Sequence, residues 1–203
     1  MEFDWKSYST DKIKGHGYQL IYEKFLDRKS KTVVELGCRG GSAKMWNEYF
    51  PEAKIYGCDI KIVRHDDESF TYLKMDMNNA SDYDQLPDNI DVIIEDGPHT
   101  AKSQLVMLDC CLDKMSNNGV IIFEDLHCTE PQYERDYIKF KGQSDITINE
   151  LLREWNDGIF NDYNYIKGSR FADKSFELTF TRGEAKKWSH QKEPSEVIVL
   201  KLK

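Results

Sequence analysis

Short apolar runs rich in β-branched residues recur along the chain, and amphipathic or glycine-containing stretches separate them. The runs predict strands over residues 31–36, 54–58, 70–75, 90–94, 119–123, 175–181 and 196–202. Apolar residues at helical spacing predict helices over residues 18–26, 43–49, 100–115 and 146–160. Strands that alternate with helices predict an α/β fold with a parallel sheet, and the last two runs predict an antiparallel hairpin at the sheet edge.

Two polar segments interrupt this pattern. Residues 1–15 carry scattered aromatic residues and are followed by closely spaced glycines, so they are predicted to form a loop that can close over a site. Residues 127–145 form a long polar connection, and loops of this length are often functional. With 203 residues, the chain is predicted to form a single domain over residues 1–203.

Composition narrows the classes of partner. The net charge of -8 and the pI near 5.2 oppose attraction to a polyanion, so we expect neither a nucleic acid nor a membrane as partner. The sequence starts without a basic region followed by an apolar one, which favours a cytoplasmic location. The five cysteines lack CxxC spacing and therefore predict neither a disulfide framework nor a zinc site.

Acidic residues follow two of the predicted strands. The run over 90–94 leads into Asp96, and the run over 119–123 leads into Glu124 and Asp125. The helix predicted between them makes these strands parallel, so their carboxyl ends lie at one edge, where open α/β sheets bind ligands. Three carboxylates in one small volume repel each other unless they are protonated or neutralised. A hard divalent cation is the simplest remedy.

A glycine turn follows the first predicted strand. Gly37, Gly40 and Gly41 precede a predicted helix, so the backbone can approach a ligand closely and the helix start offers free N–H groups. Asp59 ends the next strand about 20 residues later, a distance that suits a ribose diol. The third glycine of the dinucleotide fingerprint is missing, which disfavours an NAD-linked enzyme.

Four motifs stand out along the chain: Asp11-Lys12-x3-His16-Gly17-Tyr18, Glu35-Leu36-Gly37-x2-Gly40-Gly41-Ser42, Asp96-Gly97-x-His99 and Glu124-Asp125-Leu126-His127. They resemble motifs of class I S-adenosylmethionine-dependent methyltransferases. The narrower similarity is to metal-dependent sugar and natural-product O-methyltransferases: the macrolide deoxysugar, rhamnosyl and cephalosporin-hydroxylase-like group. The chain departs from the family at Pro98, where serine is common, and at Glu95, where aspartate is common.

The resemblance implies a Rossmann-like class I methyltransferase fold. This fold is a mostly parallel seven-stranded sheet with a C-terminal antiparallel hairpin and helices on both faces. The implied cofactors are S-adenosylmethionine and Mg²⁺ or Mn²⁺. The residues implied around S-adenosylmethionine are Glu35, Gly37, Gly40, Ser42, Asp59, Asp76, Met77 and Asp96.

The resemblance also implies roles at the reaction centre. It makes His99 the general base. The implied metal ligands are Asp96, Glu124 and Asp125. The implied acceptor contacts are His16, Tyr18 and His127. Tyr18 fits the first core residue of its helix equally well, and His127 also fits a bond to a loop carbonyl.

We therefore expect an S-adenosylmethionine- and metal-dependent O-methyltransferase. By analogy with the family, the expected acceptor is a sugar hydroxyl, such as that of rhamnose in a glycan or glycoside. A vicinal diol offers two oxygens to a metal, so a catechol-type small-molecule O-methyltransferase stays open. A non-catalytic cofactor-binding domain of a glycan-assembly protein is the other alternative. Both a homo-oligomer and a part of a larger glycan-building protein remain open.

Overall fold

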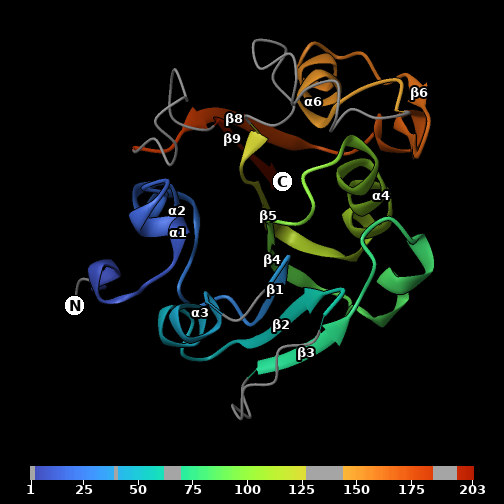
Figure 1. Cartoon of the computed structure of the whole chain (residues 1–203). Helices are drawn as coiled ribbons and strands as arrows, with labels where there is room; N and C mark the ends of the chain where they lie inside the picture. The colour runs from blue at the N-terminus through green and yellow to red at the C-terminus, as the bar shows by residue number, and fades with distance from the viewer. Residues whose placement is uncertain (1–2, 39–40, 62–69, 127–143, 185–195) are drawn as a thin grey trace.

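A seven-stranded sheet forms the centre of the molecule, with the strand order β3-β2-β1-β4-β5-β9-β8 (Figure 1). The structure is a computed structural model that describes residues 3–38, 41–61, 70–126, 144–184 and 196–203. The strands of the sheet are β1 Thr32–Leu36, β2 Lys54–Asp59, β3 Phe70–Lys74, β4 Ile90–Glu95, β5 Met115–Phe123, β8 Phe176–Arg182 and β9 Glu196–Leu202. The first five are parallel, and β9 is antiparallel to both of its neighbours. The predicted sheet, with its C-terminal antiparallel hairpin, is confirmed.

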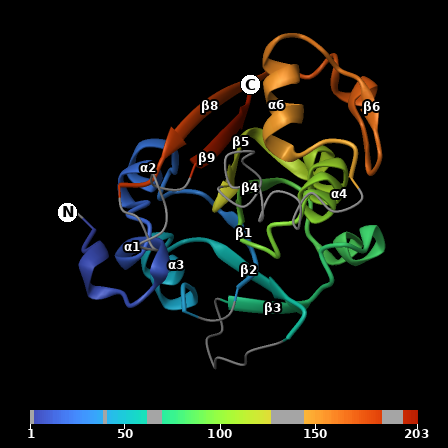
Figure 2. The same cartoon turned by 45° about the horizontal axis from the view of Figure 1, so that its top comes forward.

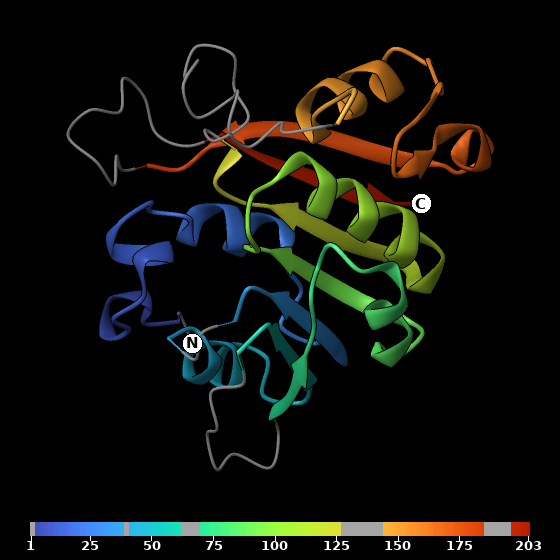
Figure 3. The same ribbon diagram turned by 45° about the vertical axis from the view of Figure 1, so that its right-hand side comes forward.

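Helices cover both faces of the sheet (Figure 1). One face carries α1 Asp11–Lys14, α2 Gln19–Phe25 and α3 Ala43–Tyr49, and the other carries α4 Ala101–Cys111 and α6 Ile148–Asn156. Figure 3 shows α4 lying along β4 and β5. The shorter elements are the 3-10 helices η1 Trp5–Ser7, η2 Ala80–Gln85, η3 Leu112–Lys114 and η6 Gly168–Phe171, and a two-stranded sheet of β6 Asp162–Tyr163 and β7 Ile166–Lys167.

Each central strand sends neighbouring side chains to opposite faces, because successive residues of a strand alternate. On one face, the strand residues Val33 and Ile94 belong to a core that includes Tyr22 of α2 and Trp46 of α3. The core on the other face includes Val34, Ile93, Leu108 and Leu151. Full burial of an aliphatic side chain of this size contributes roughly 1.5–3 kcal/mol, so the two cores fix the sheet between its helices.

The register of the parallel strands brings their carboxyl ends to one level. Leu36 pairs with Cys58 on one side and with Glu95 on the other, and Glu95 pairs with Phe123. The residues that come directly after these partners therefore emerge together at one edge of the sheet. The predicted convergence of the acidic strand ends is confirmed.

Two predicted helices are shorter in the structure. The helix predicted over 100–115 ends at Cys111, and β5 already begins at Met115. The helix predicted over 146–160 spans Ile148–Asn156 and begins with a capping box, in which Thr147 and Glu150 satisfy each other's backbone N–H groups. The side-chain amide of Asn149, in the first turn, donates to Glu196 of β9 at 2.9 Å and ties the helix to the sheet.

The N-terminal segment, predicted to be a loop, contains η1 and the short helix α1. The Thr10 hydroxyl accepts a hydrogen bond from the Lys12 backbone N–H and thereby caps α1. A helix of four residues is too short to produce a hydrophobic period, which explains why the sequence pattern missed it.

The C-terminal hairpin completes the sheet. Figure 2 shows β8 and β9 side by side, with β9 on the inner side next to β5. The inner strand β9 is buried along most of its length, whereas β8 at the margin is half-buried. Among the described helices, none combines the length and the apolar character needed to cross a lipid bilayer.

Candidate active site

A cavity of about 560 Å³ opens at the carboxyl ends of the parallel strands. Eight residues with predicted roles border it: Gly37, Ser42, Asp59, Asp76, Met77, Asp96, His99 and Asp125. The cavity is also bordered by Thr10, Asp11, Lys12, Gly41, Ile60, Met75, Asn78, Gly97 and Pro98. Gly40 and His127 lie outside the described residues. The structure therefore brings most of the predicted cofactor residues to one cavity.

Gly37 allows β1 and β4 to approach each other closely at this edge. Its φ angle of +85° lies in the left-handed region, which glycine adopts at little cost. A Cβ atom at this position would lie 1.9 Å from the carbonyl oxygen of Asp96, so the space is filled by backbone. Only glycine fits between the first strand and the Asp96 turn.

Replacing Gly37 with alanine is expected to destabilise the protein by about 3 kcal/mol or more, because both the backbone conformation and the contact with Asp96 are incompatible with a Cβ atom. Urea unfolding followed by circular dichroism measures this loss. Gly41→Ala is the matched control in the same turn, since a Cβ atom there meets nothing within 4 Å. Equal stability of the two variants would contradict the conclusion that only glycine fits at position 37.

Glu35 lies behind the cavity wall rather than in it. Its side chain is fully buried, and its carboxylate accepts a hydrogen bond from the Ser42 hydroxyl at 2.5 Å. The other carboxylate oxygen lies 3.3 Å from the Lys12 ammonium. Glu35 therefore supports the glycine turn from below, and its predicted contact with a cofactor stays a prediction.

The aspartates at the other end of the cavity are held by their own turns. Asp59 accepts a hydrogen bond from the backbone N–H of Lys61, and Asp76 accepts one from the backbone N–H of Asn78, both at 2.9 Å. Aspartate commonly fixes a turn in this way. These bonds set the direction of two carboxylates at the cavity wall.

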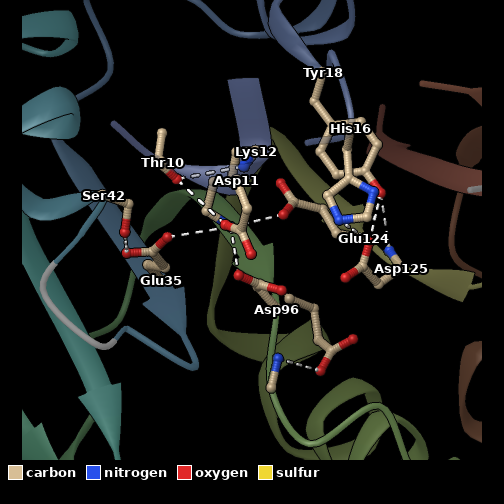
Figure 4. Close-up of polar contacts among 12 residues, drawn as sticks. Thr10, Asp11, Lys12, His16, Tyr18, Glu35, Ser42, Asp96, Glu124 and Asp125 are labelled. Carbon is tan, nitrogen blue, oxygen red and sulfur yellow. Dashed lines mark hydrogen bonds and ion pairs between the residues drawn. The ribbon is translucent and has the colours of Figure 1, made fainter. Parts of the chain in front are cut away.

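The Lys12 side chain lies at the centre of the acidic cluster (Figure 4). Its ammonium donates to Asp96 Oδ2 at 2.7 Å and to Glu124 Oε2 at 2.6 Å, in addition to the ion pair with Glu35. Only 3% of the side chain is exposed. One buried cation thus joins carboxylates from the carboxyl ends of three neighbouring strands, because Glu35 lies one residue before the end of β1, and Asp96 and Glu124 directly follow β4 and β5.

Burial and charge shift the titration of this cluster in opposite directions. Burial raises the pKa of Glu124 to about 8, although Lys12 lowers it, and burial also raises the pKa of Asp96 against Lys12 and His99. For Lys12 itself, burial lowers the pKa, but the attraction of Asp96, Glu124 and Glu35 outweighs burial and raises the pKa well above its usual value. The Lys12 ammonium therefore stays charged.

Asp96, His99 and Asp125 converge at the cavity. His99 Nε2 lies 3.7 Å from Asp96 Oδ1 and 3.8 Å from Asp125 Oδ2, and one ligand atom from each of the three residues falls within 4.8 Å of the others. His99 and Asp125 both have a φ angle of 55°. This left-handed backbone is uncommon outside glycine and marks strain of the kind found at functional sites.

Residues 16–22 hold the carboxylates that follow β5. The Tyr18 hydroxyl donates to Asp125 Oδ1 at 2.7 Å, and His16 Nε2 lies 3.3 Å from the same oxygen (Figure 4). The Tyr22 hydroxyl donates to Glu124 Oε1 at 2.5 Å. His16 and Tyr18 are both buried, so Tyr18 is a core residue, as the alternative interpretation had it. Acceptor contact by His16 and Tyr18 stays a prediction.

Two residues of this arrangement were not assigned a role from the sequence. Lys12 was noted only within a family-like motif, and Tyr22 only as one apolar position of its helix. Nothing in local spacing distinguishes a buried lysine from a solvated one. The sole signal for Lys12 was its place beside His16 and Tyr18 in that motif.

The strand order, the reversed direction of β9 and the position of the cavity define a Rossmann-like class I methyltransferase fold. The MycE methyltransferase from the mycinamycin biosynthetic pathway, solved in complex with Mg and SAH, matches with a TM-score of 0.65. The match covers 91% of this chain and 49% of that chain at 21% sequence identity. No family model matches the sequence.

Curated relatives narrow the likeness to sugar methyltransferases. The chain is 30% identical over 135 residues to 8-demethyl-8-alpha-L-rhamnosyl tetracenomycin-C 2'-O-methyltransferase of Streptomyces olivaceus, covering 59% of this chain and 35% of the relative. It is 30% identical over 91 residues to mycinamicin VI 2''-O-methyltransferase of Micromonospora griseorubida, covering 43% of this chain and 23% of the relative. The chain thus spans about a third or less of the length of these relatives.

Proposed function

We propose that this protein is an S-adenosylmethionine- and divalent-metal-dependent O-methyltransferase that acts on a sugar hydroxyl. The observation that carries the proposal is the convergence of Asp96, His99 and Asp125 at a cavity above the glycine turn. Two carboxylates, one imidazole and a cofactor-sized cavity are the groups that such a transfer needs.

The cavity wall suits S-adenosylmethionine. Gly37 brings backbone to the cavity without a side chain, and Asp59 and Asp76 offer carboxylate acceptors for hydroxyl or amino groups. Ile60 is 58% exposed, and Met77 borders the same space, so an aromatic base would find apolar cover there. These features give the cavity a polar end near Asp96 and a mixed end near Asp59.

The oxygen donors suit a hard divalent ion such as Mg²⁺. Asp96 and Asp125 each place a carboxylate oxygen within 4.8 Å of the other and of a His99 nitrogen. Glu124 lies outside the cavity lining, and we assign it as the third ligand from its sequence motif and from its link to Asp96 through the Lys12 ammonium. Glu124 Oε2 is bonded to Lys12 and Oε1 to Tyr22, but a carboxylate oxygen has two acceptor positions. Each of these oxygens therefore keeps the capacity for a further bond.

His99 is the proton acceptor in this proposal. A bound divalent ion would lower the pKa of an acceptor hydroxyl, and bound S-adenosylmethionine would supply the methyl group. With its proton on Nδ1, His99 presents the lone pair of Nε2 toward the space between Asp96 and Asp125. Nε2 then takes the hydroxyl proton, and the two aspartates stabilise the imidazolium that results.

The sugar acceptor is inferred from the relatives. The names of two of them specify methyl transfer to a rhamnosyl tetracenomycin and to mycinamicin VI. A vicinal diol would fit the acidic centre because two of its oxygens can share one hard cation. We infer a glycoside or glycan with such a diol as the substrate class.

The function is tested by incubating the protein with S-adenosylmethionine and two acceptor panels, rhamnosides and dihydroxyaromatics. Methyl transfer to rhamnosides that stops on addition of EDTA and returns with excess MgCl₂ is expected. Turnover of the dihydroxyaromatics alone would replace the sugar with a catechol. Binding of S-adenosylhomocysteine without turnover of either panel would favour a non-catalytic cofactor-binding domain.

A further inference from the structure

The proposed reaction gives Lys12 no task, yet this residue has the most unusual environment in the site. Lys12 belongs to α1, near the start of the chain, and its ammonium lies among the carboxylates of Glu35, Asp96 and Glu124. Removing a charged group from water is costly unless partners compensate it. Three carboxylates compensate the ammonium here, and two of them are residues that we assign to the metal ion.

We propose that Lys12 is a positioning residue and resident counter-ion, which holds Asp96 and Glu124 in their metal-binding arrangement before any divalent ion arrives. The inference rests on the proposed function, because the metal ion is part of it. Lys12 touches neither substrate nor reacting atoms in this proposal; it acts through the two carboxylates.

The two carboxylate oxygens of Asp96 contact different groups, and this supports a positioning role for Lys12. Lys12 binds Asp96 through Oδ2, whereas Oδ1 of the same carboxylate lies 3.7 Å from His99 Nε2. The ammonium therefore orients the Asp96 carboxylate so that one oxygen faces the cavity. Glu124 is held at both oxygens, by Lys12 and by Tyr22, so its carboxylate plane is fixed as well.

The charge of Lys12 has a second consequence. Without a cation, the carboxylates of the buried Glu35 and Glu124 and of the partly exposed Asp96 would repel each other at close range. The ammonium relieves this repulsion in the metal-free protein, but it also repels a divalent ion at the same centre. Lys12 thus stabilises the metal-free state at the expense of metal affinity.

Lys12→Met tests this trade-off, because methionine keeps the length and apolar stem of lysine but not the charge. We expect the metal-free melting temperature to fall by about 10 °C, since a buried ion-pair partner is lost. Saturating MgCl₂ is expected to restore most of this loss and to stabilise wild type less. Differential scanning calorimetry with and without MgCl₂ measures both.

A larger stabilisation of Lys12→Met by MgCl₂ means that this variant binds magnesium more tightly than wild type does. We expect its magnesium dissociation constant to be smaller by about tenfold or more, which isothermal titration calorimetry measures. Lys14→Met is the matched control: Lys14 is exposed in the same helix and its ammonium bonds only to Ser9 Oγ among the contacts seen. This variant is expected to match wild type under both conditions.

A packing role alone would lower the melting temperature of Lys12→Met equally with and without MgCl₂, and that result would overturn the proposal. An unchanged metal-free melting temperature would overturn it too. Should Lys12→Met fail to fold in either condition, the double variant Lys12→Met with Glu35→Gln decides, because Glu35 pairs with the same ammonium and is not a metal ligand in this proposal. It restores the net charge of the centre, so recovery of folding supports the counter-ion role and continued unfolding refutes it.

The proposed function can fail separately. If wild type binds no magnesium by calorimetry and turns over no acceptor, the metal-dependent reaction is refuted. The double variant then still tests the counter-ion: metal-free stability that falls in Lys12→Met and recovers in the double variant would retain that part, whereas no recovery would refute both.

Discussion

Replacing Asp125 with asparagine is expected to lower kcat/KM for methyl transfer by roughly 10²- to 10³-fold, because the acidic centre loses one negative charge that balances the divalent ion, a loss of about 3–4 kcal/mol in transition-state stabilisation. Asparagine is suited to the left-handed backbone at this position, where φ is 55°. Its amide oxygen can still accept the hydrogen bond from the Tyr18 hydroxyl. The substitution therefore removes charge while keeping the shape of the turn.

The matching measurement is the magnesium dissociation constant by isothermal titration calorimetry, which is expected to rise together with the loss of activity. Asp173→Asn is the control, since Asp173 is exposed and is not among the residues that line the cavity. Full activity of Asp125→Asn with unaltered magnesium affinity would exclude Asp125 from the metal site. Melting temperatures of both variants separate an effect on chemistry from an effect on folding.

His99→Asn is expected to lower kcat by about 10²- to 10⁴-fold, the usual contribution of a positioned general base. Asparagine again tolerates the left-handed backbone, since His99 also has a φ angle of 55°. The amide has no basic nitrogen, so it cannot take the acceptor proton. Steady-state kinetics with a rhamnoside acceptor measures the loss.

Metal affinity distinguishes the two roles that the geometry allows for His99. If His99 is the base, its removal lowers kcat and leaves the magnesium dissociation constant unchanged. If His99 is instead a metal ligand, as its place among the three converging groups allows, its removal weakens magnesium binding. A parallel loss of affinity and activity would therefore reassign His99 from proton acceptor to ligand.

The sequence was sufficient to predict the sheet and the edge that carries the site. Strand-end residues such as Asp96 and Glu124 are predictable because parallel strands that alternate with helices bring their carboxyl ends to one side. Gly37 is predictable for a different reason: it follows a strand directly, at a turn where the backbone of a neighbouring strand end approaches closely. These features follow from local pattern and topology alone.

The contacts of the side chains at the site could not be predicted from the sequence. Glu124 was predicted to face a metal ion together with Asp96, and the structure adds Lys12 and Tyr22 to its carboxylate. His16 was predicted to contact the acceptor, and the structure places it beside Asp125. Both sets of contacts join residues 12–22 to the distant carboxyl end of β5. No local periodicity encodes such contacts.

Residues 12–18 and their partners after β5 lie far apart in the sequence. Lys12 and Glu124 are separated by 112 positions, and Tyr18 and Asp125 by 107. Contacts with such separation close a large loop, and the entropy cost of closure is offset only by the contacts that form with it. We therefore expect the acidic centre to assemble late in folding, once β1, β4 and β5 have paired.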